Sequence, residues 1–404
     1  MWAGRVFLSA LAASLVTGSP LIKRQFAYGS TPVRGVNIGG WLVLEPWITP
    51  SIFEQFGNSI VDEYTLCQQA SNAEEILRSH WDSWVTVGDF QKIASNGLNL
   101  VRIPIGYWAF QKYEQDPYIQ GAADYLDAAI SWARQTGLKV WIDLHGAPLS
   151  QNGYDNSGQR TSTPGWTSGD SIDATLGVIS QISQKYGTSE YADVIAGIEL
   201  LNEPYMPGLP GGRPATQGFY QSGFDIVRGS GQTPVIIHDG FSDPSSWNGF
   251  LTGQGTSGAI IDHHEYQVFT NEFVAMSPQE HVDYVYSHAS EWAQGFDKFV
   301  ICGEWTAAMT DCAPALNGWG VGARYDGSYQ KPYDSSTYVG SCASSSSIEQ
   351  WSSDQRSATT NYINAQINVF ESMIQGWIFW NFKTENAPEW DLFRLIDNGV
   401  WPSR

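Results

Sequence analysis

Residues 194–204 of this chain read VIAGIELLNEP, an apolar run that stops at Asn202, Glu203 and Pro204. Continuous apolar runs of this length, rich in Ile and Val, are typical of strands that are buried on both faces of a parallel sheet. Short runs of this kind recur along the chain and predict eight strands. In chain order they are Val33–Ile38, Leu98–Ile105, Lys139–Leu144, Val194–Leu201, Pro234–Asp239, Ala259–Tyr266, Lys298–Cys302 and Gln375–Asn381.

Stretches with apolar residues at helical spacing separate these runs, for example Ala122–Gln135, Ser171–Tyr186, Gln279–Ala293 and Ala358–Met373. Strands that alternate with helices indicate an α/β fold with a parallel sheet. Eight such units predict a single (β/α)8 TIM barrel with loop insertions. A doubly wound sheet is the alternative, but it normally carries a glycine-rich phosphate-binding turn after its first strand, and the sequence has none.

The composition excludes several classes of partner. The 404 residues include 21 Lys and Arg against 41 Asp and Glu, which gives a net charge of −20. A chain this acidic is not expected to bind nucleic acid or an anionic membrane, because both require a basic face. The 18 tryptophans, in a chain with only 15% charged residues, suggest flat faces for stacking on sugar rings, with a large core as the alternative.

The N-terminus predicts secretion. Arg5 precedes an apolar run from Val6 to Val16, which is the layout of a signal peptide and too short to span a bilayer. Lys23 and Arg24 then resemble a dibasic processing site. We therefore expect residues 1–24 to be a signal peptide with a short propeptide. Residues 25–404 would form the catalytic barrel of a monomer that is secreted to the cell exterior or wall and has no membrane anchor.

Four cysteines allow three full pairings in an oxidising compartment. Cys312 and Cys342 flank a polar stretch rich in Gly, Ser and Tyr, and closing a loop of about 30 residues would stabilise the fold by about 3–4 kcal/mol. We favour this pair. Cys67 and Cys302 are then either a second disulfide or two buried thiols. No cysteine spacing of the metal-binding kind occurs, and we expect neither a metal nor another cofactor.

Polar residues follow several of the predicted strands, at the end of a barrel where catalytic groups are found. They are Arg102, Asp143, His145, Asn202, Glu203, His263, His264, Tyr266, Glu304, Trp380 and Asn381. Glu203 and Glu304 end strands four and seven, which can face one another across the barrel mouth. A single glutamate at a strand end more often caps a helix or pairs with a lysine, but the whole set together favours a site.

Two facing carboxyl groups are what glycoside hydrolysis needs. One must be protonated to assist the leaving oxygen, and the other must be ionised. Arg102 is expected to keep Glu304 ionised by lowering its pKa. The charge of Glu304 would then raise the pKa of Glu203 and keep that residue protonated.

Several motifs carry a family resemblance. Asn202-Glu203-Pro204 and Gly303-Glu304-Trp305 resemble the acid/base and nucleophile motifs of glycoside hydrolase family 5. More narrowly, further motifs between about Gly35 and Trp390 are similar to those of the fungal secreted exo-1,3-β-glucanases. They are GVNIGGWLVLEPW at 35–47, VRIP at 101–104, HGAP at 145–148, SQNG at 150–153 and KTENAPEW at 383–390.

The resemblance implies a retaining enzyme that releases glucose from the non-reducing ends of β-1,3-glucan and can transfer it to another sugar. Glu203 would be the acid/base and Glu304 the nucleophile. The implied supporting residues bond the 2-hydroxyl of the reacting sugar (Asn202), hold the catalytic pair (Arg102, His264, Tyr266), grip the terminal glucose (Glu45, His145, Asn156, Asn317, with Trp380 as its floor) or line the entrance (Tyr154, Phe269). The family commonly has Phe in place of Tyr154.

Three other functions remain open. An endo-β-glucanase or β-mannanase of the same family would need an open cleft, whereas the Glu45 motif and the long insertion Thr306–Trp351 favour a pocket. A noncatalytic glucan-binding wall protein is disfavoured by the two intact glutamates. The adjacent His263 and His264 raise a metal hydrolase of the amidohydrolase type, which should also show an early His-x-His motif that this sequence lacks.

Overall fold

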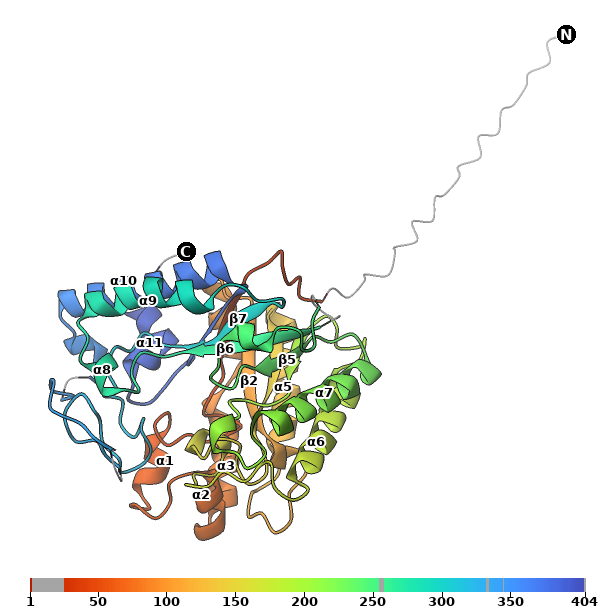
Figure 1. Ribbon diagram of the computed structural model, residues 1–404, viewed down its shortest axis with the longest axis horizontal. Helices are drawn as coiled ribbons and strands as arrows, with labels where there is room; N and C mark the ends of the chain where they lie inside the picture. The colour runs from red at the N-terminus through yellow and green to blue at the C-terminus, as the bar shows by residue number, and fades with distance from the viewer. Residues whose placement is uncertain (2–24, 254–257, 332–333, 344, 403–404) are drawn as a thin grey trace.

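The computed structural model describes residues 1, 25–253, 258–331, 334–343 and 345–402 (Figure 1). The predicted signal peptide and the Lys23-Arg24 site lie outside these residues, apart from residue 1 itself. Among the described residues, no helix is both long and apolar enough to cross a membrane.

Eight parallel strands form a closed barrel in which β10 returns to pair with β1 (Figure 1). This confirms the predicted TIM barrel. The strands are β1 (Val33–Asn37), β2 (Leu100–Gly106), β3 (Lys139–Gly146), β4 (Ile195–Glu199), β5 (Val235–His238), β6 (Ala259–Glu265), β7 (Val300–Trp305) and β10 (Gly376–Phe379). A short hairpin of β8 (Gln330–Lys331) and β9 (Asp334–Ser335) lies in the loop after β7.

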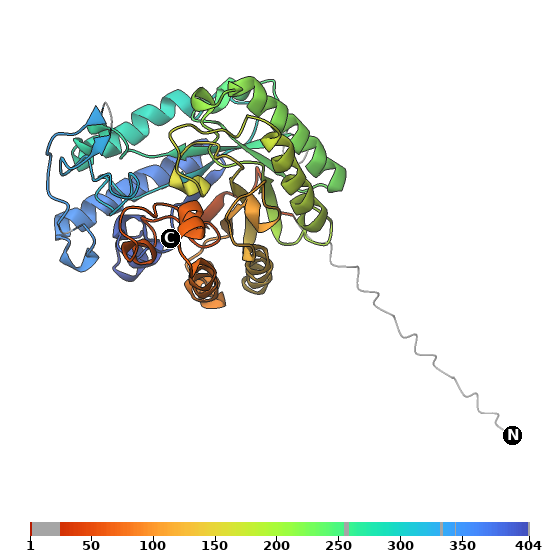
Figure 2. The same ribbon diagram turned by 90° about the horizontal axis from the view of Figure 1, so that it is seen from below.

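The helices lie around the outside of the barrel (Figure 2). They are α1 (Pro50–Glu54), α2 (Glu63–Gln69), α3 (Ala73–Trp84), α4 (Val87–Ser95), α5 (Ala122–Thr136), α6 (Ser171–Tyr186), α7 (Gly212–Ser230), α8 (Asn271–Val274), α9 (Pro278–Trp292), α10 (Ser353–Met373) and α11 (Leu392–Asp397). The predicted helices correspond to α5, α6, α9 and α10. Helix α10 begins earlier than its apolar spacing suggested, because the Ser352 side chain accepts a hydrogen bond from the Gln355 amide and caps the first turn.

The barrel interior has two layers of different character. The lower layer is a cluster of buried apolar side chains, one from each strand: Val33, Leu100, Trp141, Ala196, Ile236, Ile260, Ile301 and Ile378. Two residues further along β2, β3 and β6, the inward positions hold fully buried charged side chains instead: Arg102, Asp143 and Asp262. Strand β2 agrees with the predicted Leu98–Ile105 to within two residues at each end, so Arg102 lies inside the strand and not after it, because Ile103 and Ile105 continue the buried run.

The N-terminal segment closes the base of the barrel. Phe26 and Tyr28 pack against the lower layer together with Phe299. The Tyr28 hydroxyl accepts a hydrogen bond from Trp141 Nε1 at 2.7 Å and donates one to the Ala196 carbonyl at 3.1 Å. Side chains therefore fill the barrel from its base up to the charged layer, and the polar strand ends all lie at the opposite end.

A disulfide joins Cys312 and Cys342, whose Cα atoms are 5.2 Å apart, within the long loop that follows β7. Cys67 and Cys302 are free thiols, and Cys302 is fully buried. The loop is also bonded to other parts of the barrel rim. Trp319 donates from Nε1 to the Gly57 carbonyl and accepts at its own carbonyl from Arg160, both at about 3 Å.

Candidate active site

Glu203 lies just beyond β4, at the top of the barrel. The Asn202 backbone N–H donates to the Leu144 carbonyl at 2.9 Å, which continues the contact between the chain segments of β3 and β4 beyond the end of β4. Glu203 itself has a φ of 44°, an uncommon conformation for a residue other than glycine. Such backbone strain concentrates at functional sites. Glu203 is nevertheless buried, with 6% of its surface exposed.

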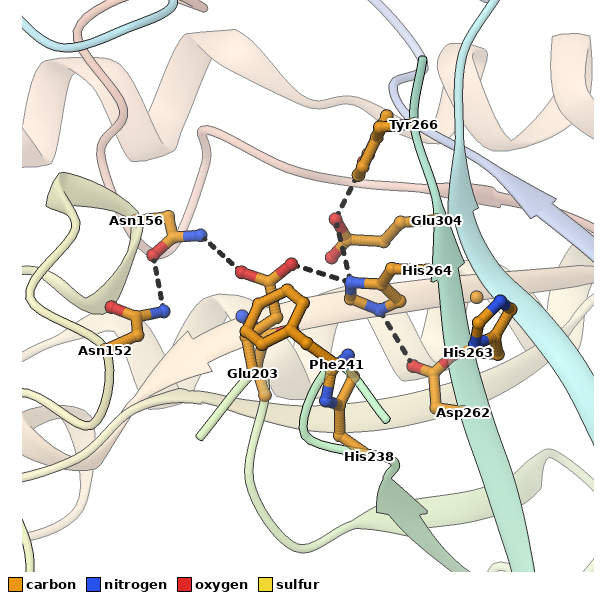
Figure 3. A network of polar contacts seen from close by, with 12 residues as sticks. Asn152, Asn156, Glu203, His238, Phe241, Asp262, His263, His264, Tyr266 and Glu304 are labelled. Carbon is orange, nitrogen blue, oxygen red and sulfur yellow. Dashed lines mark hydrogen bonds and ion pairs between the residues drawn. The ribbon is translucent and has the colours of Figure 1, made fainter. Parts of the chain in front are cut away.

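A single imidazole nitrogen contacts both candidate catalytic carboxyl groups (Figure 3). His264 Nδ1 lies 2.8 Å from Glu203 Oε1 and 3.5 Å from Glu304 Oε2. Strand pairing explains this arrangement, because His264 is the register partner of Glu304 across β6 and β7. The two carboxylate oxygens cannot be further apart than these two distances combined, which is shorter than the carboxyl separation of about 6.5–9.5 Å in inverting glycosidases.

The predicted partners are in place: Arg102 and Tyr266 at Glu304, and His264 at Glu203. Asn156, predicted to grip the terminal glucose, bonds to Glu203 as well. Glu304 accepts hydrogen bonds from Arg102 Nη1 and the Tyr266 hydroxyl, each at 2.8 Å. Glu203 Oε2 accepts one from Asn156 Nδ2 at 3.0 Å (Figure 3). Asn202 does not bond to either carboxyl group. Its Oδ1 accepts from Arg102 and its Nδ2 is buried without a partner, so the Asn202 amide is available as a donor to a ligand.

The pKa directions differ from the sequence-based expectation. Burial raises the pKa of Glu304 even though the charges of His264 and Arg102 oppose the shift. Burial also disfavours the charged form of Glu203, but the hydrogen bond and charge of His264 outweigh it and lower the Glu203 pKa. Burial disfavours the charged form of His264, but Glu304, Asp262 and Glu203 raise its pKa well above the ordinary value. In the free protein the proton expected on Glu203 is therefore held by His264.

Glu203, His238 and His264 place three possible metal-ligand atoms within 4.8 Å of one another. The Gly240 amide, however, donates a hydrogen bond to His238 Nδ1 at 2.9 Å, so this nitrogen must be unprotonated. The proton of the neutral imidazole is then on Nε2, which faces the group as a donor. His264 is likewise engaged at both nitrogens, by Glu203 and Asp262. The geometry thus suits proton exchange better than metal binding.

A second set of polar residues lies beneath the glutamates, and two of its members, Glu199 and Asp262, were not singled out from the sequence. Arg102 donates to Glu199 at 2.8 Å and to Asn37 at 3.1 Å. It also lies 3.1 Å from Asp143 and 3.5 Å from Asp262. The signal that could have found Glu199 and Asp262 is a charge inside an otherwise apolar strand, at an inward position of the barrel.

Three sequence-predicted residues form a polar recess above this layer. Glu45 accepts from Trp47 Nε1, while Glu45 Oε1 and His145 Nε2 are buried without hydrogen-bond partners. The His145 ring lies over Trp380 with a centroid distance of 5.5 Å and an interplanar angle of 10°. Burial raises the pKa of Glu45 well above its usual range, and the charges of Asp155, Glu304 and Glu203 add to the shift. Asp155 was missed by the sequence analysis, and its Oδ2 is also buried and unpartnered.

Gly39 explains why Trp380 can lie at this position. A Cβ atom at residue 39 would come within 2.7 Å of the Trp380 ring, closer than non-bonded atoms approach. Trp380 is only 3% exposed, and it packs with Trp47 and Trp390 in an aromatic cluster beside the recess.

Exposed aromatic side chains surround the mouth. Tyr154 and Phe269, predicted to line the entrance, are 46% and 40% exposed. The sequence analysis missed Tyr205 and Phe241, which are similarly exposed and contact each other with ring centroids 6.2 Å apart. Asn317 is the predicted residue that the structure does not bring to the catalytic pair. Its side chain donates to Asp311 and Gly322 and accepts from Arg324 within the disulfide-linked loop.

Comparisons with known proteins agree with this geometry. The model of the Cellulase family (glycosyl hydrolase family 5) matches residues 69–337. Glucan 1,3-beta-glucosidase of Lachancea kluyveri is 46% identical, covering 94% of this chain and 88% of that protein. The protein of the same name from Blumeria graminis is 47% identical over 96% and 92%. Among solved structures, rutinosidase from Aspergillus niger superposes with a TM-score of 0.74 at 20% identity over 94% of this chain and all of that one, which supports the fold.

Proposed function

The chain belongs to glycosyl hydrolase family 5, and from this premise we propose that it is a retaining, exo-acting glucan 1,3-β-glucosidase. The observation that carries the proposal is the contact of one His264 nitrogen with both Glu203 and Glu304. The relatives that match most of the chain are named glucan 1,3-beta-glucosidase, which supports β-1,3-glucan as the substrate.

In the first step, a Glu304 oxygen attacks the anomeric carbon of the terminal glucose and the glycosidic bond breaks. The hydrogen bonds from Arg102 and Tyr266 hold the Glu304 carboxylate in place for this attack. The leaving oxygen takes a proton from Glu203, which Glu203 receives from His264 Nδ1 across 2.8 Å. Burial raises the Glu304 pKa and so makes its carboxylate a better nucleophile than an exposed one.

In the second step, Glu203 takes a proton from a water molecule that attacks the glucosyl-Glu304 ester, and the proton returns to His264. The same intermediate reacts with a sugar hydroxyl in place of water, which is the route of glucose transfer. The unpartnered Asn202 amide is suited to donate to the 2-hydroxyl of the reacting sugar, a bond that strengthens in the transition state.

Exo action requires a pocket closed around one glucose. The loop after β7 supports such a closure, because Trp319 ties it to the rim at Gly57 and Arg160. Lys331 of this loop is close enough to Asp155 for the two charges to influence each other. Glu45, His145 and Asp155 then offer buried polar atoms without protein partners to the hydroxyl groups of the sugar.

Product analysis on laminarin tests exo action. We expect glucose as the sole product from the first minutes, because the proposed pocket would hold one sugar beyond the catalytic pair. Early oligosaccharides would instead support the endo-acting alternative. Proton NMR of the fresh product tests retention, since β-glucose must appear before the α-anomer if an enzyme-bound intermediate forms.

We further propose that the protein is secreted after removal of residues 1–24 and acts as a monomer on wall glucan. The apolar run after Arg5 and the Lys23-Arg24 pair support this proposal. N-terminal sequencing of the secreted protein should begin at Gln25.

A further inference from the structure

The charged layer beneath the glutamates contains more carboxyl groups than cations. The guanidinium of Arg102 faces Asp143, Glu199, Asp262 and Glu304 at distances from 2.8 to 3.5 Å. The first three of these carboxyl groups have no exposed surface. A buried carboxylate is costly unless it is paired and hydrogen-bonded, so one guanidinium cannot compensate all of them.

Three carboxylate oxygens in this layer have no donor, and Asp143 Oδ1 is one of them. Glu199 Oε1 and Asp262 Oδ1 are both buried and without a hydrogen-bond partner. Their sister oxygens are occupied, since Glu199 Oε2 accepts from Arg102 and Asp262 Oδ2 accepts from His264 Nε2 at 3.3 Å. The two carboxyl groups nevertheless adjoin, because Arg102 Nε lies 2.8 Å from Glu199 Oε2 and 3.5 Å from Asp262 Oδ2. Burial opposes the ionised form of Asp262, but the charges of His264 and Arg102 and a hydrogen-bonding contact with Glu199 lower its pKa. Two carboxyl groups can bond to each other only if one of them carries a proton.

The surroundings decide which group holds this proton. Asp262 faces two cations, His264 and Arg102, both of which favour its ionised form. Glu199 faces Arg102 but also two acids, Asp143 and Asp262. Burial has the largest effect on the Glu199 pKa and raises it, and the charges of the two acids add to this effect. The charge of Arg102 opposes the shift, but the Glu199 pKa still lies well above the usual range.

We propose that Glu199 is a neutral carboxylic acid that donates its proton to Asp262 and thereby positions Asp262 as the acceptor of His264 Nε2. The hydrogen-bonded series Glu199, Asp262, His264, Glu203 then runs from the barrel interior to the acid/base. Glu199 is a positioning residue, because it acts on Glu203 only through the two intervening side chains. Its role in turnover rests on the proposed function, whereas its protonation state does not.

Other polar groups packed around Glu199 are compatible with a neutral acid. Arg102 and Asp143 face it from β2 and β3. His238 of β5 has a pKa far below its ordinary value because it is buried beside His264, and so it is uncharged. The Tyr220 hydroxyl of α7 donates to the His238 carbonyl at 2.9 Å and is neutral as well. None of these groups supplies a second cation to Glu199.

Infrared difference spectroscopy of the whole protein tests the protonation state directly. The spectrum of wild type minus Glu199→Gln should contain the carbonyl band of a protonated carboxylic acid at neutral pH, and the band should shift in ²H₂O. Glu265→Gln is the matched control. Glu265 is also buried, but hydrogen bonds from His263 and His288 outweigh burial and lower its pKa to about 2, so only carboxylate bands should disappear. Loss of carboxylate bands alone in Glu199→Gln would overturn the proposal.

Kinetics on an aryl β-glucoside test the positioning role. Glu199→Leu removes the donor to Asp262 and should lower kcat/KM by about 5- to 100-fold, the cost of an unsatisfied buried acceptor. Glu199→Gln should recover most of this loss, since its amide donates to Asp262 and its carbonyl accepts from Arg102. Equal losses in the two variants would contradict a donor role.

The direction of the pH shift gives an independent result even if Glu199→Leu folds poorly. A neutral Glu199 carries no charge to remove, so the alkaline limb of kcat/KM in Glu199→Gln should stay within about 0.3 units of wild type. If Glu199 were ionised, the same variant would remove a negative charge, lower the His264 pKa and move the alkaline limb to lower pH. A wild-type protein that hydrolyses no β-glucoside would refute the proposed function, while the infrared result would still decide the state of Glu199.

Discussion

Strand β6 carries one histidine and one acidic residue on each of its two faces, and the two faces have different roles. Asp262 and His264 point into the barrel, where His264 contacts both Glu203 and Glu304. His263 and Glu265 point outward, where His263 bonds to Asp239 and lies against Trp292 with ring centroids 4.1 Å apart. Each histidine therefore lies between carboxyl groups, and both have a raised pKa.

The two faces differ in the surroundings of the carboxyl groups that the histidines contact. Glu203 lies beneath the exposed aromatic side chains of the mouth, where it can exchange its proton with a substrate. Glu265 is enclosed between β6 and α9, and His288 of α9 lies 3.4 Å from it. A histidine between acids is thus part of the candidate active site on one face, whereas on the other face it helps to hold strand and helix together. The metal hydrolase suggested by these adjacent histidines would need both on one face, which a β-strand does not allow.

The largest contrast should come from the same substitution on the two faces. Glu304→Gln should lower kcat by more than about 10⁴-fold, because no covalent intermediate can form. Glu265→Gln should retain the activity of the folded enzyme but lower its thermal midpoint, since it weakens the bonds to His263 and His288. Steady-state kinetics and thermal unfolding of both variants provide the measurement, and an inactive but stable Glu265→Gln protein would contradict the separation of roles.

The next largest effect concerns the acid/base. Glu203→Gln should lose about 10²–10⁴-fold on laminarin, whose leaving alcohol needs a proton. An aryl glucoside with a good leaving group should still glucosylate Glu304 rapidly, and rapid-mixing measurements should show a burst of phenol followed by slow turnover. A burst in Glu304→Gln instead would reverse the two assignments.

His264→Gln should change the pH dependence of kcat/KM. In the wild type, Glu203 and His264 share one proton that remains until pH exceeds the raised His264 pKa. Without His264 the proton is held by Glu203 alone, so the alkaline limb should move to lower pH by about 1–3 units. His263→Gln should leave this limb in place. Shifts of equal size in both variants would show that the two faces are not independent.

The smallest effect is on stability. Burial opposes the charged form of His263, but Asp239 and Glu265 raise its pKa to about 10, above the unfolded value of about 6.5. Its contribution is therefore complete below about pH 6.5 and is lost as pH rises to about 10. Urea unfolding should show a decline of at most about 1.4 kcal/mol per pH unit in this range. The decline should be shallower in His263→Gln, and an identical slope would argue against a charged His263.

The repeated strands of the barrel could be predicted from the sequence. The eight strands and the catalytic pair could be identified because buried parallel strands are apolar runs, and Glu203 and Glu304 interrupt such runs. Glu199 and Asp262 could not be assigned in this way, since their proximity depends on the strand register across β4, β5 and β6. The pKa directions were wrong because the position of His264 between the two glutamates follows from the register of β6 and β7. The position of Asn317 could not be predicted, because its side chain is held by Asp311 and Arg324 within a loop.

The closed base of the barrel, where Phe26, Tyr28 and Phe299 pack, determines how substrate enters and how product leaves. With the base of the barrel filled, everything that enters the proposed pocket must leave by the way it came. The shortened glucan lies outside the glucose that has just been cut from it, so the polymer has to depart first and no chain can be threaded through. Each released glucose therefore requires a separate binding event between the enzyme and the polymer. A digest of a uniform oligosaccharide should accordingly pass through every intermediate chain length in turn, as expected of a distributive enzyme.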